Sequence, residues 1–303
     1  MLLRRITQIA VVVGIAVLLC GCARGLADPI SVDETTMSNV RQALEAGIES
    51  SGGAVASVAN PTGFATLAGK FVLDGTAPPN PPLNVTKDVA VCAPGGVQVF
   101  DQIVVVGPGN GIKNVLLYIS SKIPTDNPAW IHESYAAQRD AEVIFDQRNC
   151  VFLSRVGTMW STQKLKILNS DPVGHNTNLA YKRGAKAQNT LIPEHAFAYY
   201  EPGAASPQPF PVSCSIHPWM KANMMVCDHP YSAVTGDDGS FEIANVPAGV
   251  ELEFRVWQEK SGFLQDVSVD GNNEKWSRGR FKVTLNPDER REMNVTVDAS
   301  AFQ

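Results

Sequence analysis

The sequence predicts an all-β protein built from sandwiches, and composition and patterning both favour this class. The 303 residues include 24 Gly and 20 Pro, while 44% are hydrophobic and only 18% are charged. Short apolar runs alternate with turn signals from Thr66 onward, as is typical of sandwiches and barrels. Disorder and a coiled coil are excluded, because the first needs low hydrophobicity and the second needs charged heptads. The net charge of −5, without a block of like charges, also argues against nucleic-acid binding.

Residues 1–21 are predicted to be a signal peptide. Arg4 and Arg5 precede an apolar run over 9–19, which is too short for a transmembrane helix. The tetrapeptide at 19–22, Leu-Cys-Gly-Cys, resembles a bacterial lipobox. In a lipobox the chain is cleaved between a small residue and the following Cys, and that Cys is acylated. We therefore expect an exported lipoprotein that is anchored through Cys22 at the periplasmic face of the outer membrane or at the cell surface.

Residues 22–61 are predicted to be a tether with one short helix, because Val40, Leu44 and Ile48 recur every fourth position. Residues 62–139 are expected to supply strands of a flanking sandwich. Those strands are predicted at 67–73, 103–106 and 115–119, with turns at 74–75 and 107–109.

Residues 233–303 are predicted to complete that flanking sandwich, with strands at 240–246 and 251–257. The stretch from Thr235 to Gly249, with turns at 238–239 and 247–249, resembles the transthyretin-like repeat of carboxypeptidase regulatory domains. This resemblance implies a small β-sandwich and says nothing of activity.

Residues 140–232 carry the side chains suited to a metal ion. Strands are predicted at 143–145, 151–153 and 165–168, and His175 follows the last of them. Further along, Cys214, His217 and Met220 have the spacing Cys-x2-His-x2-Met. Imidazole together with soft sulfur selects copper, and two His with one Cys under a long axial Met is the blue-copper arrangement.

The segments 169–176 and 214–226 resemble the two ligand segments of cupredoxins, and the short loop is similar to that of amicyanin. The resemblance implies that 140–232 is a cupredoxin Greek-key β-sandwich. It also implies one type 1 copper, a hydrogen bond from Asn176 toward Ser215, and a set of four ligands: His175, Cys214, His217 and Met220.

A broader resemblance, over roughly residues 62–295, is to exported cupredoxin-like proteins of planctomycete type. It is carried by the segments 87–92, 149–152, 169–172, 229–231 and 256–257. Because Cys92 and Cys150 lie in matched segments, the resemblance favours a disulfide between them. Cys227 has no assigned role, and a bond between Cys214 and Cys227, which would destroy the copper site, remains an alternative.

The other candidate ligands have structural interpretations. Met224 and Met225 are expected to be strand residues, since their spacing matches neither common cupredoxin loop. His229 is expected to be a turn histidine rather than a second ligand. The pairs His132-Glu133 and Glu194-His195 lack the i, i+4 spacing of helical ligands and are expected at the surface.

The sequence contains no Gly-x-Ser-x-Gly, phosphate loop or dinucleotide fingerprint, so we do not expect an enzyme. We expect a membrane-tethered electron carrier that passes single electrons between periplasmic redox partners. An unknown redox protein is expected to dock on an apolar rim of Pro218 and Trp219 around His217. The alternatives are a copper-handling protein without electron transfer and a β-sandwich adhesion module with a vestigial site.

Overall fold

The computed structural model describes residues 35, 37, 38, 42, 59–181 and 183–303. The predicted signal peptide, the predicted acylation site Cys22 and the three apolar residues of the predicted tether helix lie outside the described residues. No helix in the described part of the chain is long and apolar enough to cross a membrane. Residues 59–303 are almost entirely strand and loop, which confirms the predicted all-β class.

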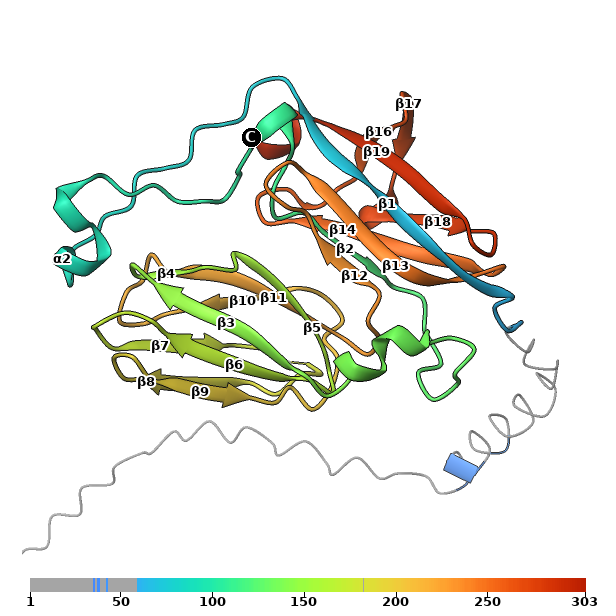
Figure 1. The fold of residues 1–303 in the computed structure, drawn as a ribbon, viewed down its shortest axis with the longest axis horizontal. Helices are drawn as coiled ribbons and strands as arrows, with labels where there is room; N and C mark the ends of the chain where they lie inside the picture. The colour runs from blue at the N-terminus through green and yellow to red at the C-terminus, as the bar shows by residue number, and fades with distance from the viewer. Residues whose placement is uncertain (1–34, 36, 39–41, 43–58, 182) are drawn as a thin grey trace, which may run out of the picture. The chain divides into compact units, whose positions relative to one another are not determined.

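Two sheets form the first sandwich (Figure 1). One has the order β13-β1-β19-β16-β17, with bounds Ser240–Ala248, Gly63–Asp74, Arg290–Asp298, Asp266–Val269 and Asn272–Lys275. The other has the order β12-β2-β14-β15, with β18 paired to β14; the bounds are Ser232–Val234, Leu116–Ile119, Glu251–Gln258, Gly262–Phe263 and Arg280–Thr284. Inward-facing side chains from both sheets fill one core that includes Leu67, Phe71, Leu117 and Phe254.

The predicted strand at 103–106 is wrong. Val106 makes one isolated bridge to Ile112, and the segment is otherwise irregular. Side chains satisfy several of its backbone groups, and the Val105 carbonyl accepts from the N–H of Lys113. Asn80 bonds both the N–H and the carbonyl of Val104, and the Gln258 amide donates to the Ile103 carbonyl.

Two further sheets form the second sandwich. One has the order β4-β3-β6-β9, with bounds Val151–Phe152, Glu142–Arg148, Lys164–Asn169 and Phe197–Tyr200. The other has the order β5-β11-β10-β7-β8, with bounds Val156–Trp160, Lys221–Cys227, Phe210–Ser213, His175–Leu179 and Gln188–Ile192. The core of this second sandwich includes Phe145, Leu165, Tyr200 and Val226. Within residues 59–303, the short helices are α2 (Val89–Cys92) and five 3₁₀ turns: Pro94–Gly96, Pro108–Asn110, Glu133–Gln138, Ser277–Gly279 and Ala299–Phe302.

The two sandwiches meet at a seam. Tyr118 of β2 packs there in a small cluster with Val156, Met225 and Cys227 of the second sandwich. Arg155, which is 8% exposed, forms ion pairs with Asp101 at 2.9 Å and with Glu259 at 2.5 Å. The seam therefore combines apolar packing with a buried charged network.

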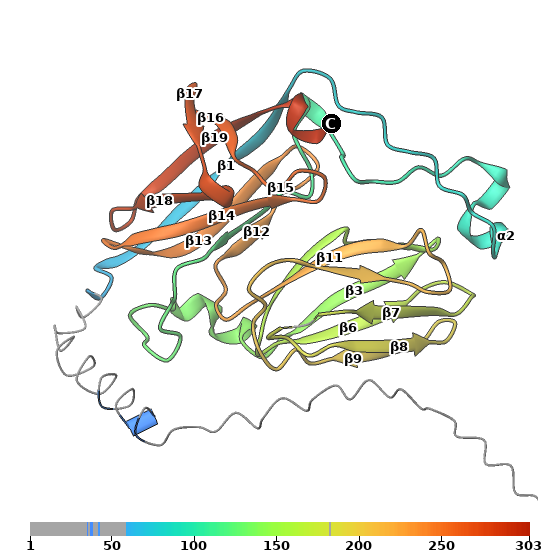
Figure 2. The ribbon, with the colours of Figure 1, turned by 180° about the vertical axis from the view of Figure 1, so that it is seen from behind.

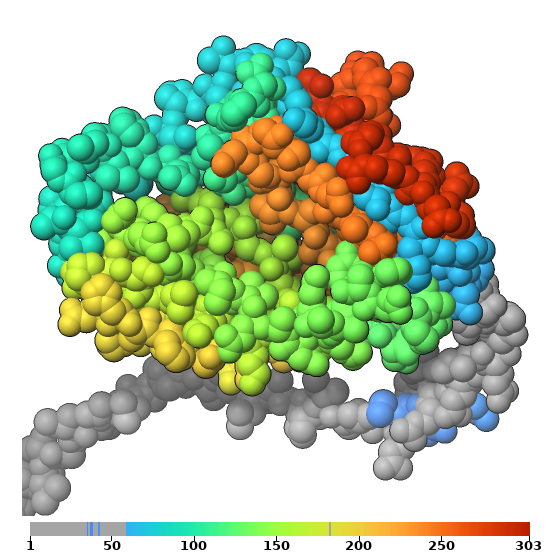
Figure 3. Space-filling model, in the orientation of Figure 1, coloured from blue at the N-terminus to red at the C-terminus, as the bar shows by residue number. Residues whose placement is uncertain are grey.

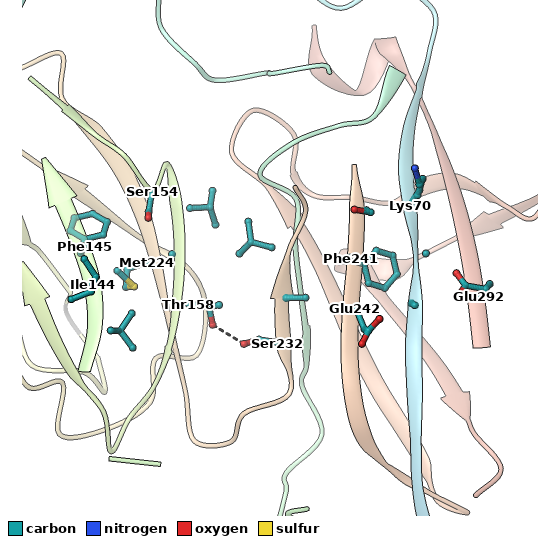
Figure 4. Close-up of a pocket in the computed structure, with 18 of the residues that line it drawn as sticks. Lys70, Ile144, Phe145, Ser154, Thr158, Met224, Ser232, Phe241, Glu242 and Glu292 are labelled. Atoms are coloured by element: carbon teal, nitrogen blue, oxygen red, sulfur yellow. Dashed lines mark hydrogen bonds between the residues drawn. The ribbon is translucent and has the colours of Figure 1, made fainter. Parts of the chain in front are cut away.

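A cavity of about 760 Å³ lies along this seam (Figure 4). Phe241 and Glu242 line it from the first sandwich, and Ile144 and Met224 line it from the second. The hydroxyls of Thr158 and Ser232 bond across it at 2.7 Å.

The connection from β1 to β2 leaves the first sandwich and carries α2 to one end of the second, as Figures 1 and 2 both show. We call residues 83–99 of this connection the cover segment. The N–H of Leu83 donates to the Val99 carbonyl at its base, and Leu83, Val85 and Val91 pack against the core of the second sandwich. In Figure 3 its teal atoms lie directly against the green and yellow atoms of that sandwich.

Candidate metal centre

Three of the four predicted ligands come together at one end of the sheet that contains β7, β10 and β11. His175 is the first residue of β7, and Cys214 follows the last residue of β10. These two strands are antiparallel neighbours, so the start of one and the end of the other lie at the same edge. The loop from Cys214 to Met220 joins β10 to β11 and brings His217 to the same place.

The geometry of the donors is compact. The Nδ1 atoms of His175 and His217 face each other at 2.9 Å. The Cys214 sulfur and a ring nitrogen of each histidine all lie within 4.8 Å of one another. Both imidazoles are fully buried and the thiol is 2% exposed. Two imidazole nitrogens and one thiol sulfur are donors that copper prefers, so this set fits a copper ion.

Met220 lies at the end of the same loop, and its side chain is buried in the core of the second sandwich. Its N–H donates to the His217 carbonyl at 2.9 Å, and its carbonyl accepts from the N–H of Cys214 at 3.3 Å. The loop is thus closed on itself by hydrogen bonds between the backbones of three predicted ligands.

A carboxylate contacts the outer nitrogen of each imidazole. The Nε2 of His175 lies 2.8 Å from the Asp171 carboxylate, and the Nε2 of His217 lies 2.8 Å from that of Asp88. A carboxylate that accepts from Nε2–H leaves Nδ1 without a proton, as a metal ligand requires. Burial lowers the pKa of His175, which also favours its neutral form; the bond to Asp171 opposes this shift.

Neither carboxylate is among the site residues that the sequence predicts. Asp171 lies inside the cupredoxin-like segment 169–176, four residues before His175, so the sequence alone could have identified it as a partner of that histidine. Asp88 is 129 residues from His217, and no local pattern links the two.

The Cys214 sulfur accepts hydrogen bonds from the N–H groups of Asn176 at 3.5 Å and His217 at 3.4 Å. The Asn176 side-chain oxygen accepts from the N–H of Ser215 at 2.6 Å and of Ile216 at 3.2 Å. The contact that the resemblance implied between Asn176 and Ser215 is therefore made mainly to the backbone, and it joins β7 to the ligand loop.

A disulfide between Cys92 and Cys150, the pair that the resemblance favours, lies beside the centre. The sulfur atoms of both lie within 4.8 Å of a ring nitrogen of His217. Cys214 and Cys227 are both free thiols, and Cys227 lies at the far end of β11 from the ligand loop.

The remaining histidines and methionines have other surroundings. Met224 and Met225 are buried in β11, the first in the core of the second sandwich and the second at the seam. His229 is 3% exposed, with its Nε2 donating to the Ile119 carbonyl at 3.1 Å, and burial lowers its pKa. His132 caps a 3₁₀ turn through Nδ1, and His195 is exposed.

The surface near the ligand loop differs from the expected rim. Pro218 is exposed, but His217 is 0% and Trp219 only 9% exposed. The indole packs on the imidazole, with ring centroids 5.2 Å apart, while Asp88 of the cover segment contacts the outer edge of the imidazole. The cover segment therefore separates His217 from solvent.

No protein-family model matches the chain, and no curated protein matches it. Among solved structures, it is similar to a copper-containing nitrite reductase from Thermus scotoductus SA-01, at 17% identity over 28% of this chain and 22% of that chain, with a TM-score of 0.26. Amicyanin from Paracoccus versutus is 15% identical over 37% of this chain and 91% of that chain, with a TM-score of 0.25. A Cu(I) form of an amicyanin variant is 15% identical over 38% of this chain and 99% of that chain, with a TM-score of 0.26. Similarity at this level assigns no activity.

Proposed function

We propose that this protein binds one copper ion through His175, Cys214, His217 and Met220 and carries single electrons. The main support is the convergence of two Nδ1 atoms and one thiol in a buried volume. A bound copper ion would supply a one-electron Cu(I)/Cu(II) couple. The proposal assigns no catalytic step to the chain.

The residues around the centre support the electron-carrier proposal because they hold the donors in place. Each imidazole has a carboxylate on Nε2, and the Cys214 sulfur has two N–H donors. Donors fixed in this way move little when the charge of the centre changes, which keeps the reorganisation energy of electron transfer small.

Burial of His217 favours a second candidate, a copper-handling protein without electron transfer, because no ring edge is open to a partner. Cyclic voltammetry of the copper-loaded protein distinguishes the two. A reversible one-electron couple together with an intense thiolate-to-copper absorption supports the carrier. Copper that binds without a reversible couple, yet passes readily to a chelator, supports copper handling.

We further propose that the chain is an exported lipoprotein, kin to cupredoxin-like proteins of planctomycete type, whose redox partner approaches at the ligand loop. Ser215 and Pro218 are the exposed residues of that loop. A small contact surface of this kind suits the brief encounters of redox partners. The first sandwich, by its likeness to transthyretin-like repeats, is proposed as a support rather than a second active module.

The lipid anchor is tested by Cys22→Ser. We expect the variant to accumulate as an unprocessed or soluble product, because acylation of this sulfur is the proposed attachment to the membrane. Detergent phase partitioning of the variant beside the wild type measures the change. Equal retention of both in the detergent phase would contradict the lipoprotein proposal.

The axial ligand is tested by Met220→Leu. The protein should keep copper and its colour, because a long axial thioether adds little to affinity. Its reduction potential should rise by on the order of 60 mV, about a tenfold change in the ratio of Cu(II) to Cu(I) affinity, since the oxidised state loses a donor. The matched controls Met224→Leu and Met225→Leu should leave the potential nearly unchanged. An unchanged reduction potential in Met220→Leu, together with a changed potential in either control variant, would reject Met220 as the axial ligand.

A further inference from the structure

We infer that the cover segment closes the metal centre and that Asp88 is the positioning residue through which it holds His217. The inference rests on the proposed copper site and adds what controls access to it. It assigns a role in the site to a segment that comes from the connection between β1 and β2 of the first sandwich.

The first step is the contact between Asp88 and His217. The carboxylate oxygen lies 2.8 Å from Nε2 of an imidazole that is 0% exposed, while the Asp88 side chain is 32% exposed. The carboxylate thus occupies the boundary between the centre and the solvent. By accepting from Nε2–H, it keeps the His217 ring turned so that Nδ1 faces His175.

The second step is how Asp88 is itself held. Its backbone has a left-handed conformation, with φ of 49°, at the start of α2. Its carbonyl accepts from the N–H groups of Val91 and Cys92, each at 2.9 Å. Cys92 is bonded to Cys150 of the second sandwich. The carboxylate on His217 is therefore only four residues from a covalent link to the sandwich.

Cys150, the second cysteine of the disulfide, is connected through Asp171 to His175. Asp171 accepts from Nε2 of His175 and also from the N–H of Cys150, both at 2.8 Å. The disulfide thus connects two chains of contacts, one through Asp88 to His217 and one through Asp171 to His175. Cutting it frees the cover segment from its covalent attachment while leaving Asp171 in place.

Reduction is the natural way to cut this link. A dithiol reductant gives two electrons and two protons to the disulfide, forming thiols at Cys92 and Cys150, and is itself oxidised to a disulfide. The cover segment is then held without a covalent bond, by the Asp88 contact, by the buried Cys92 and Ala93, and by the partly buried side chains of Leu83, Val85 and Val91. We therefore expect access to the centre to rise when the disulfide is reduced.

Alkylation of Cys214 in the copper-free, full-length protein tests the closure without any metal. N-ethylmaleimide is added, and the modified cysteine is identified by peptide mass spectrometry, which separates Cys214 from the other thiols. We expect the rate constant for Cys214 to rise at least tenfold in Asp88→Ala and in the double variant Cys92→Ser/Cys150→Ser. Lys87→Ala, an exposed neighbour on the cover segment, is the matched control and should stay within twofold of the wild type.

A second measurement needs no substitution: wild-type protein is reduced with a dithiol, which is removed without air before N-ethylmaleimide is added, and Cys214 should show the same acceleration. If Cys214 reacts at the wild-type rate in Asp88→Ala, or if a folded reduced wild type reacts no faster than the oxidised protein, the closure is wrong. A circular dichroism spectrum of each sample identifies acceleration caused by unfolding, which would also reject it.

The positioning role is tested by nitrogen NMR of the His217 ring. The wild type should show a single form with the proton on Nε2, and Asp88→Ala a mixture of both tautomers. Asp88→Asn, whose amide oxygen still accepts, should restore the single form. An unchanged ring in Asp88→Ala would leave Asp88 with no positioning role. These measurements are independent of copper, so a protein that passes them but binds no copper would reject the proposed function alone.

Discussion

Copper-loaded Cys214→Ser is expected to lose its visible charge-transfer absorption completely, because the intense band of a blue-copper centre requires a thiolate ligand. Cys214 is the buried thiol whose sulfur lies within 4.8 Å of ring nitrogens of His175 and His217. Serine offers a hydroxyl, which binds copper weakly and gives no such band. The measurement is an absorption spectrum of each variant after titration with one equivalent of Cu(II).

Cys227→Ser is the matched control and should keep the colour. Burial raises the pKa of the Cys227 thiol to about 12, so this cysteine stays protonated at neutral pH. It also lies at the seam and not beside the ligand loop. Loss of colour in both variants would mean that Cys227 is a ligand or that the assigned centre is wrong.

Asp171→Ala is expected to destabilise the protein by roughly 3 to 5 kcal/mol, because one buried carboxylate accepts three hydrogen bonds. Its oxygens bind the N–H groups of Asn149 at 2.6 Å and Cys150 at 2.8 Å, besides the Nε2 of His175. Both of these N–H groups belong to a two-residue turn with left-handed φ angles of 52° and 54°, a backbone conformation that residues other than glycine rarely adopt. Urea unfolding of the copper-free protein measures the loss.

The same substitution should weaken copper binding by about 10-fold to 100-fold, as is usual when the partner of a ligating histidine is removed. Asp266→Ala is the control for stability, because its side chain is 81% exposed and its lysine partner is 3.9 Å away. That variant should change stability by less than about 0.5 kcal/mol. A similar small change in Asp171→Ala would contradict the role given to this carboxylate.

The all-β class could be predicted because its signals are local. Turn residues end short apolar runs, as at the Asp238-Gly239 turn, where Gly239 has φ of +77° and a side chain would collide with the Phe71 carbonyl. The strand predicted at 103–106 failed because the side chains of Asn80 and Gln258, which are distant in sequence, satisfy the backbone groups of Val104 and Ile103. A pattern of apolar residues carries no information about such partners.

The candidate site likewise has features that the local sequence predicts and features that depend on distant contacts. The spacing of Cys214, His217 and Met220 is local, so the ligand loop was accessible to sequence analysis. The disulfide pair came from a resemblance, and spacing alone left other pairings open. Burial of His217 could not be predicted, because it depends on Asp88 in a connection of the first sandwich.

X-ray absorption at the copper edge shows whether two imidazoles and the Cys214 thiolate hold the copper ion. With one equivalent of copper bound, we expect one sulfur at a short, thiolate-type distance together with two imidazole nitrogens. That sulfur should be lost in Cys214→Ser but not in Cys227→Ser. A coordination shell of nitrogen and oxygen alone, or a sulfur that persists in Cys214→Ser, would rule out this copper centre.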